Sequence, residues 1–72
     1  GNQEGNMNYL LEALVKKLEG EVEVAKANVI VYTRNSVGIG EHPEVVEAIE
    51  AQVEKIATAQ EKIDIIKKYF PS

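Results

Sequence analysis

The chain has 72 residues, of which 44% are hydrophobic and 28% are charged, and its net charge is −4 at pH 7. This composition is typical of one small soluble domain and excludes a largely disordered chain. Acidic residues outnumber basic ones by 12 to 8, which argues against nucleic-acid binding, because phosphate contacts need clustered Lys and Arg. No apolar run approaches the roughly 20 residues of a transmembrane helix, and no secretory signal is recognisable, so we expect a cytoplasmic protein without membrane contacts. The absence of cysteine excludes disulfides and thiolate metal sites.

The first residues, 1–7, are polar, contain glycine and lack periodicity, which predicts a disordered tail or a cloning remnant. Met7 is the only methionine and directly precedes the periodic region. It is either the native first residue or an ordinary interior methionine, and the sequence leaves both open. The helical hairpin is expected over residues 8–72.

The first predicted helix covers about residues 8–34, with Asn8 as its N-cap. Its apolar residues recur at alternating steps of three and four, which keeps one face of a helix turned toward a neighbour. These steps fall on Leu11, Val15, Leu18, Val22, Ala25, Val29 and Tyr32. Residues 29–33 are rich in β-branched and aromatic side chains and also suit a short strand. Since a single strand would have nothing to pair with, helix is the favoured interpretation.

The segment of about residues 35–42 is the predicted loop. Gly38 and Gly40 can adopt positive φ, and Pro43 suits the first position of the next helix. The loop also carries two weak site hypotheses. Its Gly-x-Gly amides could bind an anion, but the glutamates that follow would repel it, and His42 beside Glu41 is too small a ligand set for a specific metal site. We therefore assign the loop no cofactor and no metal.

The second predicted helix covers about residues 43–70, with apolar steps at Val46, Ile49, Val53, Ile56, Gln60, Ile63, Lys67 and Phe70. An antiparallel return places residues whose numbers sum to about 78 opposite one another. This pairing predicts a hairpin core of Val15, Leu18, Val22, Ala25, Val29, Ile49, Val53, Ile56 and Ile63. Gln60 either fixes the register as a buried polar residue or lies at the edge of the core.

Further apolar residues beside these steps make the stripe wider than one partner helix can cover. The residues predicted to form an oligomer interface are Leu10, Leu11, Leu14, Val24, Val31, Val45, Ile66 and Phe70. Because so short a chain rarely builds a sufficient core alone, we expect two hairpins to pair as a homodimeric four-helix bundle. The alternative is that a different protein supplies the missing helices. A column of small residues, Ala13, Gly20 and Ala27, either admits another helix or is a solvated face.

No set of residues predicts catalysis, since the acidic side chains line an exposed helix face and His42 has no nucleophile in a definable relation to it. The expected function is that of a non-enzymatic structural or protein-interaction module. One alternative is an adaptor whose acidic second helix, with Glu44, Glu47 and Glu50, binds a basic protein. A less favoured one is a metal- or anion-binding module at the loop.

The segment NSVGIGEHP at 35–43, with YLLEAL at 9–14 before it and EVVEAI at 44–49 after it, resembles small uncharacterised helical-hairpin proteins of marine tailed phages. The resemblance covers nearly the whole chain from Met7. It implies an accessory or structural role in assembly, and it carries no catalytic residues to transfer.

Overall fold

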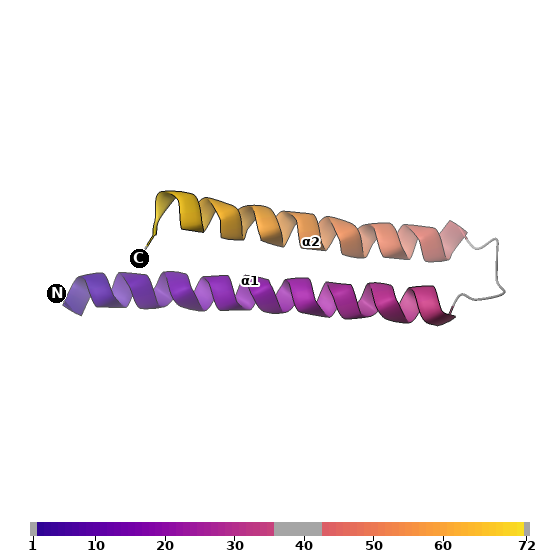
Figure 1. Cartoon of the computed structure of the whole chain (residues 1–72), viewed down its shortest axis with the longest axis horizontal. Coiled ribbons are helices and arrows are strands. Elements are labelled where there is room, and N and C mark those ends of the chain that lie inside the picture. Colours follow the sequence, from indigo (N-terminus) through magenta and orange to yellow (C-terminus); the bar gives the residue numbers. More distant parts are fainter. Residues whose placement is uncertain (1, 36–42, 72) are drawn as a thin grey trace.

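The computed structural model describes residues 2–35 and 43–71, which form two helices, α1 (Asn2–Asn35) and α2 (Pro43–Tyr69). The helices run antiparallel and side by side, so that the start of α1 and the end of α2 lie at the same end of the molecule (Figure 1). The hairpin is a single layer, 58 Å long and 16 by 12 Å across. The predicted all-α hairpin of two helices is confirmed.

The first helix is longer than predicted. It begins at Asn2 rather than at Asn8, so the expected tail is helical from its second residue onward. Extending an existing helix costs little, because each added residue brings its own backbone hydrogen bond. Residues 29–33 are helical, and the Thr33 hydroxyl donates a hydrogen bond of 2.9 Å to the carbonyl of Ile30. The favoured helix over this segment is therefore correct, and the part of the chain that the structure describes contains no strand.

The second helix begins at Pro43, as predicted, and ends at Tyr69. Glu44 in its first turn and Lys67 and Lys68 in its last turn match the helix dipole at both ends. The amide of Phe70 still donates to the carbonyl of Ile66 over 2.8 Å. The predicted turn residues Gly38 and Gly40, together with His42, lie outside the described residues.

On α1, the side chains that face α2 are those at the predicted steps. Leu18 and Ala25 are buried, and Leu11, Val15, Val22, Val29 and Tyr32 are half-buried. Asn28, which the pattern did not select, is half-buried beside them.

On α2, every second position of the seam between the helices lies one residue before the position that the apolar steps predicted. The buried and half-buried residues of the seam are Val45, Ile49, Gln52, Ile56, Ala59, Ile63 and Ile66, and Ala48 beside them is also half-buried. Val53, predicted in the core, is instead 52% exposed, and Gln60 is exposed at the edge. The predicted seam would bury Lys67, and an unpaired buried ammonium is costly. The observed seam buries Ala59 in place of Gln60 and Ile66 in place of Lys67.

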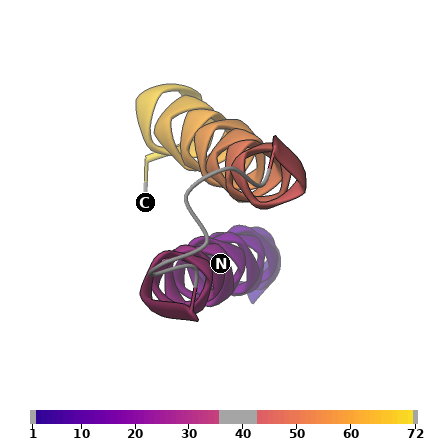
Figure 2. The same cartoon turned by 90° about the vertical axis from the view of Figure 1, so that its right-hand side faces the viewer.

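The buried apolar core is small and lies toward the end of the hairpin where α1 starts and α2 ends. Its cluster consists of Leu18, Ala59, Ile63 and Ile66, with Leu11, Val15 and Val22 packed against it. The helices cross obliquely, so contact is not equally close along the whole seam (Figure 2). Ile66, predicted at an oligomer interface, thus belongs to the core of the hairpin itself.

Candidate functional site

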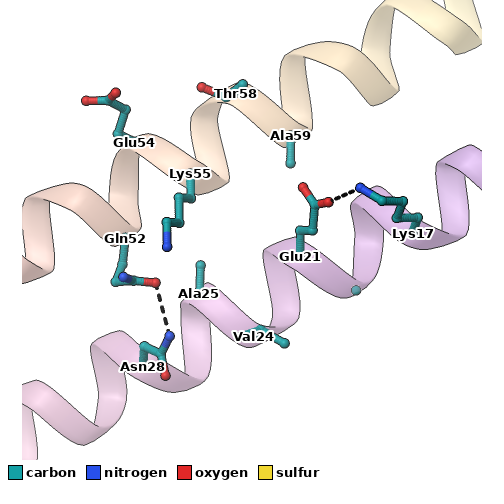
Figure 3. A pocket seen from close by; sticks show the side chains of 11 residues that line it. Lys17, Glu21, Val24, Ala25, Asn28, Gln52, Glu54, Lys55, Thr58 and Ala59 are labelled. Atoms are coloured by element: carbon teal, nitrogen blue, oxygen red, sulfur yellow. Dashed lines mark hydrogen bonds and ion pairs between the residues drawn. The ribbon is translucent and has the colours of Figure 1, made fainter.

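A groove of about 690 Å³ runs along one side of the seam and is lined by both helices (Figure 3). Ala25 and Ala59 lie at its floor, where two methyl groups leave the helices little side-chain bulk between them. Gly20 and Val24 on α1 and Thr58 on α2 form its walls. A Cβ atom placed on Gly20 would meet nothing within 4 Å, so this wall is open.

A pair of side-chain amides closes the seam toward the loop end of the groove. The Asn28 Nδ2 donates a hydrogen bond of 3.1 Å to the Oε1 of Gln52, which is only 8% exposed (Figure 3). A buried amide with a partner escapes most of the cost of desolvation. The apolar periodicity did not predict this pair, although Gln52 lies seven residues before Ala59 in the same column of α2.

Four charged residues line the groove, Lys17 and Glu21 on α1 and Glu54 and Lys55 on α2. Lys17 forms an ion pair with Glu21 on the same helix, and the side chain of Lys55 extends from α2 toward α1 (Figure 3). The hydrogen bond and charge of Lys17 hold the pKa of Glu21 below its ordinary value of 4.5, against a smaller opposing effect of burial, and the charge of Lys62 adds to the lowering. Because Lys17 and Glu21 are both exposed, the pair contributes little to stability.

Apolar side chains extend the groove at both of its ends. Positions seven or fourteen residues from a lining residue lie on the same side of a helix in a hairpin of this kind, and Val24 lines the groove itself. This places six exposed large apolar side chains beside the groove, and we call this side of the hairpin the groove face. They are Leu10, Leu14, Val24, Val31, Ile65 and Tyr69.

The residues predicted as an oligomer interface therefore separate into two groups. Leu10, Leu14, Val24 and Val31 are exposed on the groove face. Leu11 and Val45 are half-buried in the seam, Ile66 is buried in it, and Phe70 is exposed beside a second hollow near the end of α2. Ile65 and Tyr69 were missed, because the predicted seam on α2 was rotated away from them.

The opposite side of the hairpin, which we call the charged face, is more polar. It carries eight charged residues, which are Glu12, Lys16, Glu19, Glu23, Lys26, Glu50, Asp64 and Lys67. Lys26 pairs with Glu23 over 3.2 Å, and the Gln60 Nε2 donates to Asp64 over 3.1 Å. Four large apolar residues, Tyr9, Ile30, Val46 and Val53, are exposed between these charges. The groove face is therefore the more apolar of the two.

The accessible surface of the chain is larger than that of a compact protein of the same mass. It measures 5759 Å². A compact protein of 8.0 kDa exposes about 4,400 Å². The excess of about 1,300 Å² exceeds the roughly 800 Å² that each partner buries in a protein–protein interface of ordinary size.

Neither a cluster of metal ligands nor a helix that could cross a membrane is found among the described residues. Within 2–35 and 43–71, no group of three His, Asp or Glu side chains could hold a metal ion. Neither helix, over the same residues, is long and apolar enough to cross a membrane. Glu44, Glu47 and Glu50 are exposed along α2, whereas Glu41 and His42 of the loop hypotheses fall outside the described residues.

Comparison of the chain with known protein families, with curated proteins and with solved structures gives no match.

Proposed function

We propose that this protein is a non-enzymatic structural module that self-associates through its groove face, two hairpins forming a four-helix bundle. The observation that carries this proposal is the excess of exposed surface together with the gathering of six large apolar side chains on one side of the hairpin. A second hairpin would cover both helices of the first at once. Such a scaffold role would agree with the assembly function that the resemblance to phage hairpin proteins implies.

The decisive measurement is the molar mass in solution, by light scattering coupled to size exclusion, over a hundredfold range of protein concentration. A homodimer has a mass of about 16 kDa, twice the 8.0 kDa of the chain. A mass of about 8 kDa at every concentration would contradict self-association.

A matched pair of variants tests which face is covered. Val24 is 62% exposed on the groove face, and Val53 is 52% exposed on the charged face. We expect Val24→Glu to dissociate the dimer, because an unpaired carboxylate in an apolar interface is costly, and Val53→Glu to leave the mass unchanged. The reverse result would place the interface on the charged face.

A second candidate is an adaptor that binds a basic protein along the outer edge of α2. Glu47, Glu54 and Glu61 follow one another at seven-residue intervals and are all exposed there. If this edge is a docking site, a lysine-rich helical peptide should bind with an affinity that falls with salt, and reversing the three charges should abolish binding.

A further inference from the structure

We propose that the two hairpins pair about a two-fold axis parallel to their helices, so that α1 of each copy lies against α2 of the other. This inference rests on the proposed self-association through the groove face and adds which helices meet. It places the Asn35 ends of both α1 helices at the same end of the bundle.

Two identical hairpins can close face to face in two ways. With the axis parallel to the helices, each α1 meets the partner's α2. With the axis across the helices, α1 meets the partner's α1 and α2 meets the partner's α2. All neighbouring helices are antiparallel in both arrangements, so the helix dipoles do not distinguish them, but the charges do.

The hydrogen bond between Asn28 and Gln52 fixes which residues lie at the same height along the hairpin. Residues of α1 and α2 whose numbers sum to about 80 are level with one another. A rotation about an axis parallel to the helices leaves heights unchanged, so the same sum relates α1 of one copy to α2 of the other. Each residue between two levels adds about 1.5 Å.

At the centre of the groove face, the parallel axis brings opposite charges together. Glu21 falls at a height between the partner's Lys55 and Lys62, which follow one another at a seven-residue interval on α2, and it is within about 6 Å of either along the axis. Lys17 is nearly level with the partner's Lys62, but its charge is already paired with Glu21 on the same helix. When the two hairpins overlap along their full length, the transverse axis instead sets Glu21 close to the height of the partner's Glu21, and Lys55 level with the partner's Lys62. Like charges facing each other across an interface are destabilising.

The charged residues on the outer edges of the helices also favour the parallel axis. On the edge of α1, Lys17 and Arg34 fall within about 3 Å of the heights of the partner's Glu61 and Glu47, respectively. With the transverse axis, the edge of α2 would meet the same edge of the partner. Glu54 and Glu61 of the two copies would then face one another.

The charges of the groove face therefore favour the parallel axis over the transverse one. Because the chain bears four charged residues around the groove and acidic residues along α2, this preference acts at both the centre and the rim of the interface. The charges thus select the orientation, whereas the apolar side chains provide the affinity.

A series of spin labels on α2 tests the orientation. The chain contains no cysteine, so single substitutions can be labelled cleanly. Val46→Cys, Val53→Cys and Gln60→Cys lie at seven-residue intervals in one exposed column of the charged face, away from the proposed interface. Pulsed electron paramagnetic resonance then measures the distance between the two labels of a dimer.

With the parallel axis, the three distances should be nearly equal, since each label lies level with its counterpart. With the transverse axis and hairpins that overlap along their full length, the axis crosses the middle of the hairpin near the height of Gln60. The separation along the helices would then grow from near zero at position 60 to about 40 Å at position 46. Gln60→Cys is thus the internal control.

Light scattering on each labelled variant shows whether the protein self-associates, which the distances between labels alone do not. A dimer with equal distances supports the inference. A dimer whose distances grow from position 60 to position 46 overturns the inference and leaves the proposed function standing, and a monomer overturns both.

Discussion

Ile66 lies inside the seam of α2 and Val53 lies outside it, so substitutions at Ile66 should lower the stability of the protein and substitutions at Val53 should hardly change it. Ile66 is 9% exposed and packs within the core cluster, whereas Val53 is 52% exposed. Ile66→Val removes one methylene from the seam and should lower the free energy of unfolding by about 1 kcal/mol. Ile66→Ala removes three carbon atoms and should lower it by about 2–3 kcal/mol. Val53→Ala removes two carbon atoms from the surface, and its effect should stay within about 0.5 kcal/mol.

The assay is urea unfolding followed by circular dichroism at 222 nm. All variants are compared at one protein concentration, because the proposed self-association would make stability depend on concentration. Ile66→Val is the gentler substitution and keeps the test informative if Ile66→Ala fails to fold. A larger destabilisation by Val53→Ala than by Ile66→Val would contradict the observed seam. It would mean that Val53, and not Ile66, is buried between the helices.

Three other substitutions test separate features. Gly20→Ala should raise the free energy of unfolding by about 0.5–1 kcal/mol in the same urea assay, because alanine favours a helix interior and its Cβ meets nothing within 4 Å in the single hairpin; a loss of stability would mean that the proposed partner hairpin packs against this wall too closely to admit a methyl group. Gln52→Leu should change stability by no more than about 1 kcal/mol but broaden the distribution of oligomers in sedimentation velocity, because the only buried polar side chain of the described seam would be lost; a single sharp dimer would argue against a role in specificity. Lys17→Met should raise the pKa of Glu21 toward 4.5 in a carbon-13 NMR titration. Since that pKa is depressed in the folded chain, the small stabilisation by the pair is present above pH 4.5 and is lost as the pH falls through the depressed value, a loss that should vanish in the variant; an unchanged Glu21 titration would assign the shift to other groups.

The α1 side of the hairpin was predictable because its apolar steps are unambiguous. Each of the seven steps from Leu11 to Tyr32 carries an apolar or aromatic residue, and each of these side chains is buried or half-buried. The periodicity alone is sufficient there, because no competing column is equally apolar.

On α2, either of two neighbouring columns of residues could face α1 on the basis of apolar periodicity. Which of them is buried depends on a contact between the helices that periodicity does not reveal. One column has Val46 and Val53 but also Lys67, and the other has Ile66 but also Gln52. The second column is buried because Gln52 finds an amide partner across the seam in Asn28. A polar residue that is satisfied by a neighbour far away in the sequence cannot be recognised by counting hydrophobic steps.

The candidate interaction surface was partly predictable for the same reason. The four α1 residues of the groove face follow from the width of the apolar stripe, whereas Ile65 and Tyr69 required the correct rotation of α2. The start of α1 at Asn2 was not predictable from side-chain pattern, since polar residues extend a helix without marking it.

The uneven placement of the core has a mechanical consequence. The start of α1 and the end of α2 lie at the same end of the hairpin (Figure 1). A force that pulls these two ends apart therefore separates the helices one contact after another, beginning at that end. The first contacts to break are those around Leu11 and Ile66, followed by Leu18 and Ala59, which belong to the most apolar part of the seam. The contacts nearer the loop, including the Asn28–Gln52 amide pair, bear load only afterwards. The hairpin should therefore resist most strongly at the onset of stretching and yield with falling force once its first turns have separated.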